Sequence, residues 1–413
     1  MMHGRGFHGT RSNPPMKLLA IAVFIAAMAS CGGVGHTQTV KVGVISTYSG
    51  PLAAGGDQID RGISLYMKLH EADLPPGVKI ELLRRDDTGP NPEVAKRLTQ
   101  ALITHDKVRL LVGVVWSPNA LAMAPLVTEA KVPLIITNAS TSMITTKSPY
   151  IVRVSLTSWQ GPYPLGFWAA KHGLKNVYTL VSDYSTGIDA EVAFDKAFTE
   201  AGGTIVGAVR MPVTTPDFVP YLQRAKDAKP DAVFAFVPGA KESTALMKAF
   251  ADLGLSAAGI KLIGPNSLTP DEELSNMGDA AIGTLTMGHY SAAATRPANQ
   301  AFVAAYKAEF GATAEPGYMA ADSYDGMAAI FHVVIEQHGE IDPDRTMALL
   351  KGWQFDSPRG PVLIDPETRD VVQNEYLRRV EKIDGQLRNV ELETIPMVKD
   401  PWKEINKPQA DGR

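Results

Sequence analysis

Cysteine is almost absent from the 413-residue sequence, which contains Cys31 alone and therefore cannot form a disulfide bond within the chain. An excess of either charge is absent too, because 40 basic and 44 acidic side chains are mixed along the whole length. This mixture provides neither a basic stripe nor an acidic tail, so we expect no nucleic acid partner. With 45% hydrophobic residues, the chain can bury the cores of two ordinary domains.

Catalytic motifs are absent as well. There is no G-x-S-x-G elbow, no phosphate-binding P-loop, no G-x-G-x-x-G turn and no H-E-x-x-H zinc motif. The nine histidines are scattered along the chain. The carboxylate pairs Asp86 with Asp87 and Asp322 with Asp325 are interpreted as structural. We therefore predict no metal site, no cofactor and no enzymatic activity, with an exported α/β enzyme as the open alternative.

Long hydrophobic runs are absent from the interior of the sequence, and none there approaches the length of a transmembrane helix. An apolar run near the N-terminus covers residues 18–29 behind Lys17, and its twelve residues fit the core of a secretory signal rather than a bilayer span. We predict that residues 1–30 form a signal peptide with a polar N-terminal extension, and that translation starts at Met1 or Met16. The protein is then periplasmic.

The end of this signal leaves two forms of processing open. Cys31 follows Met-Ala-Ser directly, which resembles a bacterial lipobox and makes Cys31 a candidate lipidation site. Residues 27–29 also fit an A-x-A cleavage site, and cleavage after Ala29 would leave Cys31 as a free thiol.

From residue 40 onward, short β-branched runs alternate with amphipathic stretches, which is typical of βαβ units and a parallel sheet. The alternation occurs twice and predicts an α/β protein with two doubly wound lobes. Expected strands cover 40–46, 78–84, 108–115, 132–137, 150–156, 177–183, 204–211, 232–237, 261–264 and 283–290. Expected helices cover 56–71, 92–105, 118–130, 187–201, 217–228, 243–254, 299–310 and 319–338. Residues 360–398 turn β-rich, and a loose tail is expected beyond Pro401.

Ligands of open α/β sheets lie at the carboxyl ends of the strands, so binding residues are expected there. After the strand at 108–115 comes Trp116-Ser117-Pro118, where Ser117 suits a helix N-cap and the helix start offers backbone N–H groups to an anion. After 132–137 comes a run of small polar residues containing Ala139, Ser140 and Thr141, which can hydrogen-bond a carboxylate without a cation. Helix capping alone is the competing interpretation at each position.

The second half of the chain has matching strand ends. Tyr184 and Thr186 follow one strand, Gly239 follows another, and Asn266 follows Gly264-Pro265. We expect these residues to face the anion-binding residues across a cleft, with helix capping by Ser185 or Thr186 as the alternative.

Several segments carry a family resemblance. The opening Val42-Gly43-Val44-Ile45, followed by Ser49-Gly50-Pro51-Leu52-Ala53, Gly56 and Arg61-Gly62, resembles that of the branched-chain amino-acid type of periplasmic binding proteins, and so do later segments such as Ile263-Gly264-Pro265 and Gly360-Pro361-Val362. This resemblance implies a two-lobed type I periplasmic-binding fold with a three-crossing hinge. It implies a monomeric receptor that traps a small solute and delivers it to an ABC permease in the inner membrane.

Laid on that fold, the chain would cross between lobes near Leu156, Tyr290 and Phe355. The predicted first lobe is 40–156 with 290–355, the second is 157–289 with 356–399, and residues 400–413 are a tail. In the family, serine, alanine and threonine groups at strand ends hold the ligand carboxylate, and here they fall on Trp116-Ser117 and Ala139-Ser140-Thr141.

One position departs from the family pattern. Amino-acid binders of this family carry an acidic residue after the Gly-Pro to pair with the ligand ammonium, whereas this chain has Asn266. A neutral amide gives a desolvated ammonium no charge-assisted bond. We therefore hypothesise a carboxylate without an α-amino group, such as an aromatic acid that stacks on Trp116 or Tyr184. A branched-chain amino-acid binder and a periplasmic ligand sensor are the alternatives.

Overall fold

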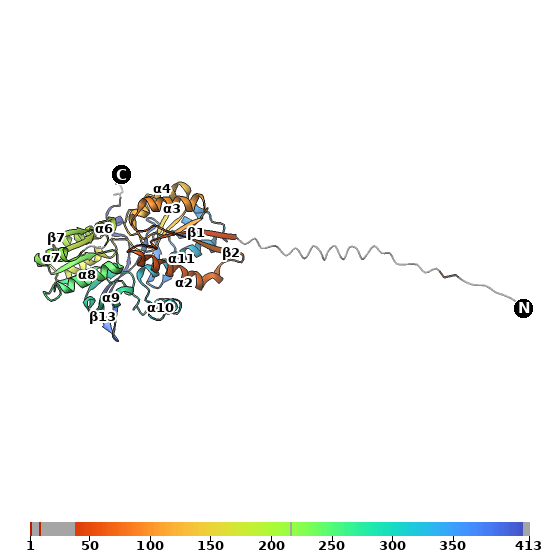
Figure 1. Ribbon diagram of the computed structural model, residues 1–413. Coiled ribbons are helices and arrows are strands. Elements are labelled where there is room, and N and C mark those ends of the chain that lie inside the picture. Colours follow the sequence, from red (N-terminus) through yellow and green to blue (C-terminus); the bar gives the residue numbers. More distant parts are fainter. Residues whose placement is uncertain (2–7, 10–37, 215–216, 408–413) are drawn as a thin grey trace. The chain divides into compact units, whose positions relative to one another are not determined.

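The computed structural model describes residues 1, 8–9, 38–214 and 217–407 (Figure 1). Apart from residues 1 and 8–9, the predicted signal peptide lies outside the described residues, and so does Cys31. The compact unit Thr39–Arg413 carries both of the sheets described below. Within the described residues, no helix is both long enough and apolar enough to cross a bilayer.

The first sheet has five strands in the order β2-β1-β3-β4-β5. The pairs β1–β3, β3–β4 and β4–β5 are parallel, with Val42 opposite Leu110 and Leu111 opposite Leu134. All residues of β3, β4 and β5 are buried, as expected for parallel strands covered on both faces. The strands are β1 (Gln38–Ser46), β2 (Val78–Asp86), β3 (Leu110–Gly113), β4 (Leu134–Ile136) and β5 (Ile151–Arg153).

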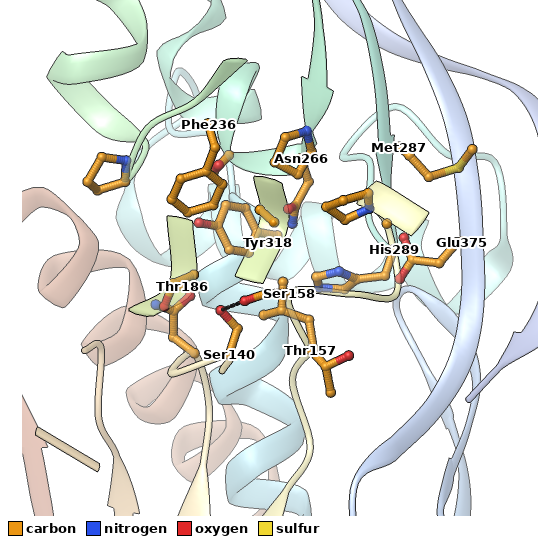
Figure 2. A pocket seen from close by; sticks show the side chains of 18 of the residues that line it. Ser140, Thr157, Ser158, Thr186, Phe236, Asn266, Met287, His289, Tyr318 and Glu375 are labelled. Carbon is orange, nitrogen blue, oxygen red and sulfur yellow. Dashed lines mark hydrogen bonds between the residues drawn. The ribbon is translucent and has the colours of Figure 1, made fainter. Parts of the chain in front are cut away.

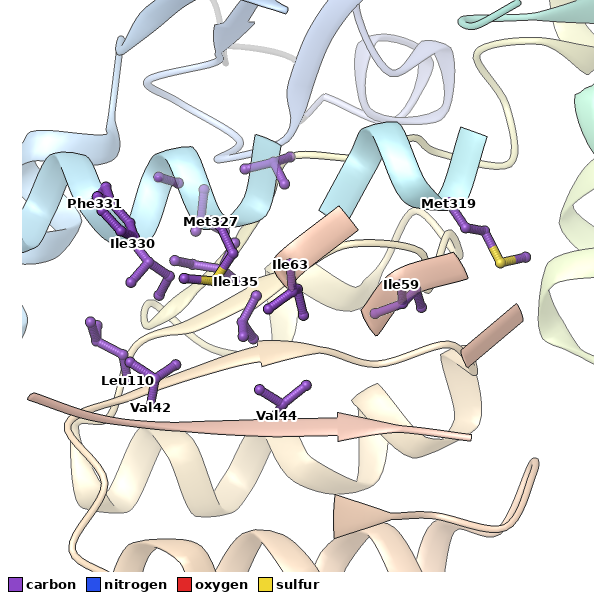
Figure 3. Packing of buried hydrophobic residues seen from close by; sticks show 14 of the residues in the cluster. Val42, Val44, Ile59, Ile63, Leu110, Ile135, Met319, Met327, Ile330 and Phe331 are labelled. Carbon is purple, nitrogen blue, oxygen red and sulfur yellow. The ribbon is translucent and has the colours of Figure 1, made fainter. Parts of the chain in front are cut away.

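Helices cover this sheet on both faces. On one face, Val44 and Ile135 belong to a buried cluster with Ile63 of α2 and Ile330 of α11 (Figure 3). On the other face, α3 and α4 contribute to a second cluster with Leu111. The four helices are α2 (Ala53–His70), α3 (Pro92–Thr104), α4 (Ser117–Ala130) and α11 (Tyr318–Glu336).

The packing of α2 against α11 depends on Gly62. A Cβ atom at Gly62 would lie 2.2 Å from the carbonyl oxygen of Ala320, so only glycine allows the two backbones to approach this closely. Because α11 comes late in the chain, this contact attaches a distant segment to the first sheet. The lobe boundaries themselves stay a prediction.

The second sheet has nine strands, in the order β11-β12-β13-β10-β9-β8-β6-β7, with β14 paired to β13. Neighbouring strands in the part β10-β9-β8-β6-β7 are parallel. The pairs β10–β13, β13–β12, β12–β11 and β13–β14 are antiparallel. The strands are β6 (Asn176–Ser182), β7 (Thr204–Met211), β8 (Ala232–Phe236), β9 (Lys261–Pro265), β10 (Leu285–Gly288), β11 (Gln354–Ser357), β12 (Gly360–Ile364), β13 (Val371–Ile383) and β14 (Gln386–Val398).

Helices cover the second sheet in the same manner. Phe234 of β8 stacks on Phe194 of α6 at 4.2 Å between ring centroids, and Leu165 of α5 joins their cluster. On the opposite face, Val233 packs with Leu246 of α8. These helices are α5 (Pro162–Lys171), α6 (Ser185–Glu200), α7 (Val219–Asp227) and α8 (Ala240–Asp252), and further helices are α9 (Leu274–Met277), α10 (Pro297–Phe310), α12 (Pro343–Leu350) and α13 (Pro401–Ile405).

The predicted α/β class, with two sheets of mostly parallel strands, is confirmed. A turn at Asp384-Gly385 joins β13 to β14, and both residues have positive φ, 49° and 78°, as a two-residue type I′ turn requires. Helices α5, α9, α12 and α13 were missed.

The prediction of a loose tail beyond Pro401 is wrong for the described residues. Asp400 caps α13 by accepting a hydrogen bond from the backbone N–H of Trp402. Lys403 of this helix is buried and forms an ion pair with Asp370, which is also buried. The acidic partner lies far away in sequence, so composition alone could not reveal the contact.

Candidate functional site

A cavity lies where strand ends of the two sheets meet (Figure 2). Residues after β3, β4 and β5 contribute from the first sheet, and residues at the ends of β8, β9 and β10 contribute from the second. The cavity therefore occupies the position predicted from the carboxyl ends of parallel strands.

Two serines form part of the wall from the first sheet. The hydroxyl of Ser158 donates to Ser140 Oγ at 3.1 Å, and the backbone N–H of Ser158 donates to the Ser140 carbonyl at 2.8 Å (Figure 2). These bonds tie the loops after β4 and β5 together. Because Ser140 Oγ accepts in this pair, its own proton is available to an acceptor in the cavity.

Ser117 lies behind this wall and not on the cavity surface. Its hydroxyl oxygen accepts hydrogen bonds from the backbone N–H groups of Ser140 and Thr141, each at 3.1 Å. With both lone pairs used, the Ser117 proton must be donated to Thr186 Oγ1, which lies 2.8 Å away. Thr186 lines the cavity, and its hydroxyl also interacts with the Tyr184 hydroxyl.

The expected helix start at Ser117 is therefore different in the structure. Ser117 is the first residue of α4, Trp116 occupies the N-cap position, and no side chain caps this helix. The hydroxyl of Ser117 accepts hydrogen bonds from the backbone of the loop after β4, and these bonds hold that loop against α4.

The wall from the second sheet carries Asn266, directly after β9. Asn266 is 3% exposed, and its Nδ2 has no hydrogen-bond partner within the described residues. The hydroxyls of Ser267 and Thr157, which also line the cavity, are likewise buried without a partner in the described part of the chain. Leaving such groups unpaired costs about 1–3 kcal/mol each, so these positions are suited to a polar ligand.

Aromatic rings supply the flat surfaces of the cavity. Tyr184, Phe236 and Tyr318 line it, and Phe236 and Tyr318 are visible together in Figure 2. Trp116, the predicted stacking surface, packs against Tyr184 at 5.8 Å between ring centroids and donates its indole N–H to Thr47. It lines a smaller neighbouring space instead, so the stacking prediction fits Tyr184 rather than Trp116.

The structure thus brings together part of the predicted set. Ser140, Tyr184, Thr186 and Asn266 line the cavity, whereas Trp116, Ser117, Ala139, Thr141 and Gly239 do not. The carbonyl groups of Ala139 and Thr141 accept hydrogen bonds from the buried Arg153, whose guanidinium is paired with Asp370. Gly239 and Trp116 line the neighbouring space.

Several cavity residues were missed by the sequence analysis, among them His289 and Glu375. His289 follows β10 directly, but the expected strand at 283–290 ran past it and hid the strand end. Glu375 lies within the antiparallel strand β13, where the rule of parallel strand ends does not apply. Its neighbours Gln373 and Asn374 are polar too, so no local sequence signal marked Glu375.

Burial sets the protonation of both residues. Removal from water raises the pKa of Glu375 to about 8. It lowers the pKa of His289 in spite of the neighbouring Asp322, whose carboxylate lies 2.9 Å from Nε2. Asp322 and Asp325, interpreted above as structural, both pair with the buried Arg359 at 2.8 Å.

The cavity has a neutral character. None of the described residues that line it is lysine or arginine. Nor do three or more His, Cys, Asp or Glu side chains gather anywhere in the described ranges in a way that could hold a metal ion. Two sheets of mostly parallel strands, with a cavity between their strand ends, are typical of a binding protein of the two-lobed α/β class.

Comparison with known proteins identifies the family. Residues 39–386 match the family described as Periplasmic binding protein, and the chain belongs to this family. The "Leu/Ile/Val-binding protein homolog 6" of Brucella melitensis is 40% identical over 94% of this chain and 98% of its own length. The resemblance predicted from the sequence is confirmed.

Solved structures agree with this assignment. A solute-binding protein of an ABC transporter from Rhodopseudomonas palustris BisB5, in complex with 3,4-dihydroxybenzoic acid, is 50% identical and superposes with a TM-score of 0.85, covering 88% of this chain and 99% of that one. A second R. palustris solute-binding protein, in complex with 4-hydroxybenzoate, is 42% identical with the same TM-score and coverage. The type I periplasmic-binding fold is confirmed.

The function class follows from the family. The chain is a solute-binding protein of the ABC-transporter type, and its relatives are binding proteins rather than enzymes. Membership of the family also implies a periplasmic location.

Proposed function

We propose that this protein captures a small aromatic carboxylate in the cavity between its sheets and presents it to an ABC permease in the inner membrane. One observation carries the proposal: the cavity offers neutral hydrogen-bond donors and aromatic surfaces, and no lysine or arginine is among its described lining residues.

The donors suit a carboxylate. Ser140 has a proton left after its contact with Ser158, the Thr186 hydroxyl lines the cavity beside Tyr184, and Asn266 has a buried amide N–H without a partner among the described residues. Charge-assisted hydrogen bonds to a carboxylate are roughly twice as strong as neutral ones, so several such donors can hold the anion without a cation.

The remaining surface suits a ring. Phe236, Tyr184 and Tyr318 present large apolar faces inside the cavity, and aromatic pairs add about 0.5–1.5 kcal/mol beyond the area that they bury. The two R. palustris relatives described above were solved with hydroxybenzoates, which supports an aromatic acid as the ligand.

The working cycle is hinge closure without catalysis. The lobes would be 40–156 with 290–355 and 157–289 with 356–399, and the ligand would stabilise the closed arrangement by contacting both. The hydrogen bond between Ser117 and Thr186 is one protein contact that such a closure would form. The proposal includes a monomeric receptor, export directed by residues 1–30, and Cys31 as the candidate lipid anchor.

A branched-chain amino acid is the second candidate, and Glu375 is the observation that favours it. Its carboxyl group lines the cavity and would pair with a ligand ammonium if it were ionised. The Brucella relatives carry the name Leu/Ile/Val-binding protein homolog. Against this candidate, burial raises the pKa of Glu375 to about 8, so the group is mostly neutral at pH 7.

Isothermal titration of the ligand-free protein distinguishes these candidates. The protein is unfolded and refolded to remove any bound solute, and it is then titrated with benzoate, 4-hydroxybenzoate and leucine at pH 7. We expect an aromatic acid to bind and leucine not to bind. Binding of leucine without any aromatic acid would refute the proposal. Mass spectrometry of the solute that co-purifies provides an independent identification.

A further inference from the structure

One end of the cavity differs chemically from the rest. Figure 2 shows Glu375 and His289 on the side of the cavity away from Phe236 and Thr186. Both side chains are 1% exposed. The hydroxyl and amide groups elsewhere in the cavity can donate hydrogen bonds, whereas this end presents an imidazole and a carboxyl group.

The sheet register brings these two residues together. The antiparallel ladder between β10 and β13 ends where Gly288 lies opposite Tyr376. Continuing this register by one residue places His289, which follows β10, opposite Glu375 of β13. Residues that lie opposite each other on neighbouring strands point their side chains to the same face of the sheet, and both His289 and Glu375 line the cavity.

His289 acts as a hydrogen-bond acceptor toward the cavity. Its Nε2 lies 2.9 Å from Asp322 Oδ1, and Arg359 holds the same carboxylate at 2.8 Å. An imidazole that donates Nε2–H to a carboxylate and stays neutral must carry a lone pair on Nδ1. Burial lowers the pKa of His289, which keeps the ring neutral at pH 7.

Glu375 provides a second acceptor at the same end. A carboxyl group can accept a hydrogen bond whether or not it is ionised. The space beside it is kept open by Gly161, because a Cβ atom at that position would lie 3.5 Å from Glu375 Oε2 and 3.0 Å from the Met287 carbonyl oxygen. Both Gly161 and Met287 line the cavity.

We infer that the Glu375–His289 end of the cavity receives a hydroxyl group on the ring of the ligand, so that the solutes are hydroxybenzoates rather than unsubstituted benzoate. This inference rests on the proposed function. A ring hydroxyl donates to the acceptors at this end while the carboxylate accepts from the donors elsewhere. An unsubstituted ring would leave two buried polar groups facing a C–H bond, and sites built to bind a hydroxyl discriminate strongly against analogues that lack it.

The first test uses the unaltered protein and a ligand series. Benzoate, 4-methylbenzoate, 3-hydroxybenzoate, 4-hydroxybenzoate and 3,4-dihydroxybenzoate are titrated at pH 7. We expect the dissociation constant of at least one hydroxybenzoate to be about tenfold or more below that of benzoate, with 4-methylbenzoate no better than benzoate. Equal affinity for benzoate and all hydroxybenzoates would overturn the inference and leave the proposed function intact. Failure of every aromatic acid to bind would refute both.

The second test locates the preference. Glu375→Leu removes the acceptor and is expected to reduce the ratio of hydroxybenzoate to benzoate affinity by about tenfold, whereas Glu375→Gln keeps a carbonyl acceptor and retains most of the ratio. Glu381→Gln is the matched control, because Glu381 lies on the same strand, pairs with Arg379 at the surface and does not line the cavity. An equal loss of benzoate and hydroxybenzoate affinity in Glu375→Leu would place the ligand carboxylate at this end and overturn the inference.

Discussion

Ser117 and Thr186 share a hydrogen bond of 2.8 Å between their hydroxyl oxygens, although Ser117 begins α4 beside the first sheet and Thr186 lies in the first turn of α6 beside the second. Ser117 also accepts from the backbone of Ser140 and Thr141. The buried Ser117 hydroxyl therefore joins the helices of the two sheets and also holds the loop that lines the cavity.

Replacing Ser117 tests this connection. Ser117→Ala leaves two backbone N–H groups and Thr186 without their partner, and we expect the free energy of unfolding to fall by about 1–3 kcal/mol. Urea denaturation followed by circular dichroism measures the change. Ser256→Ala, at an exposed position, is the control and should leave the stability unchanged. A Ser117→Ala protein as stable as the parent would mean that water replaces the lost hydroxyl.

Ser140 is expected to act on ligand binding directly. Its hydroxyl lines the cavity and has a proton free for the ligand, so Ser140→Ala should weaken binding of the aromatic carboxylate by about 1–3 kcal/mol. Isothermal titration gives the difference in affinity, and thermal unfolding shows whether the fold is retained. Unchanged affinity would limit Ser140 to its contacts with Ser158 and Ser117.

Asn266→Asp places a negative charge next to the proposed carboxylate site. Like charges repel strongly in a buried cavity, so the affinity for an aromatic acid should fall at least about tenfold at pH 8 and less at pH 5, where the new aspartate is partly protonated. Titrations at both pH values measure this. Asn406→Asp makes the same charge change at an exposed position outside the cavity and should leave the affinity unchanged. Unaltered binding by Asn266→Asp would place the carboxylate elsewhere.

Much of the architecture follows from local sequence patterns. Buried β-branched runs predicted most strands of the two parallel sheets, and the position of residues after these strands predicted Ser140, Tyr184, Thr186 and Asn266 at the cavity. Such predictions succeed because the carboxyl ends of parallel strands must gather at one edge of a sheet.

The remaining site residues depend on contacts between distant segments. Glu375 reaches the cavity because β13 pairs antiparallel with β10, and nothing near Glu375 in the sequence indicates that pairing. Ser117 was expected to bind the ligand, but its hydroxyl is occupied by Thr186, which lies on another sheet's helix. Hydrogen bonds between lobes depend on how the lobes approach, and a single sequence does not carry that information.

The buried carboxyl of Glu375 also gives the protein a pH dependence that can be measured. Its pKa is raised from an ordinary value of 4.5 to about 8, because burial disfavours the charged form. Between these two values the folded protein keeps a proton that the unfolded chain loses, so the free energy of unfolding should fall as the pH rises, by up to about 1.4 kcal/mol per pH unit. Below pH 4.5 both states are protonated, and above pH 8 both are ionised, so the contribution is constant there. Glu375→Gln cannot ionise, and its stability should fall less between pH 5 and pH 8 than that of the parent or of Glu381→Gln in urea denaturation. Parallel pH profiles for Glu375→Gln and the parent would show that Glu375 titrates normally in the folded protein.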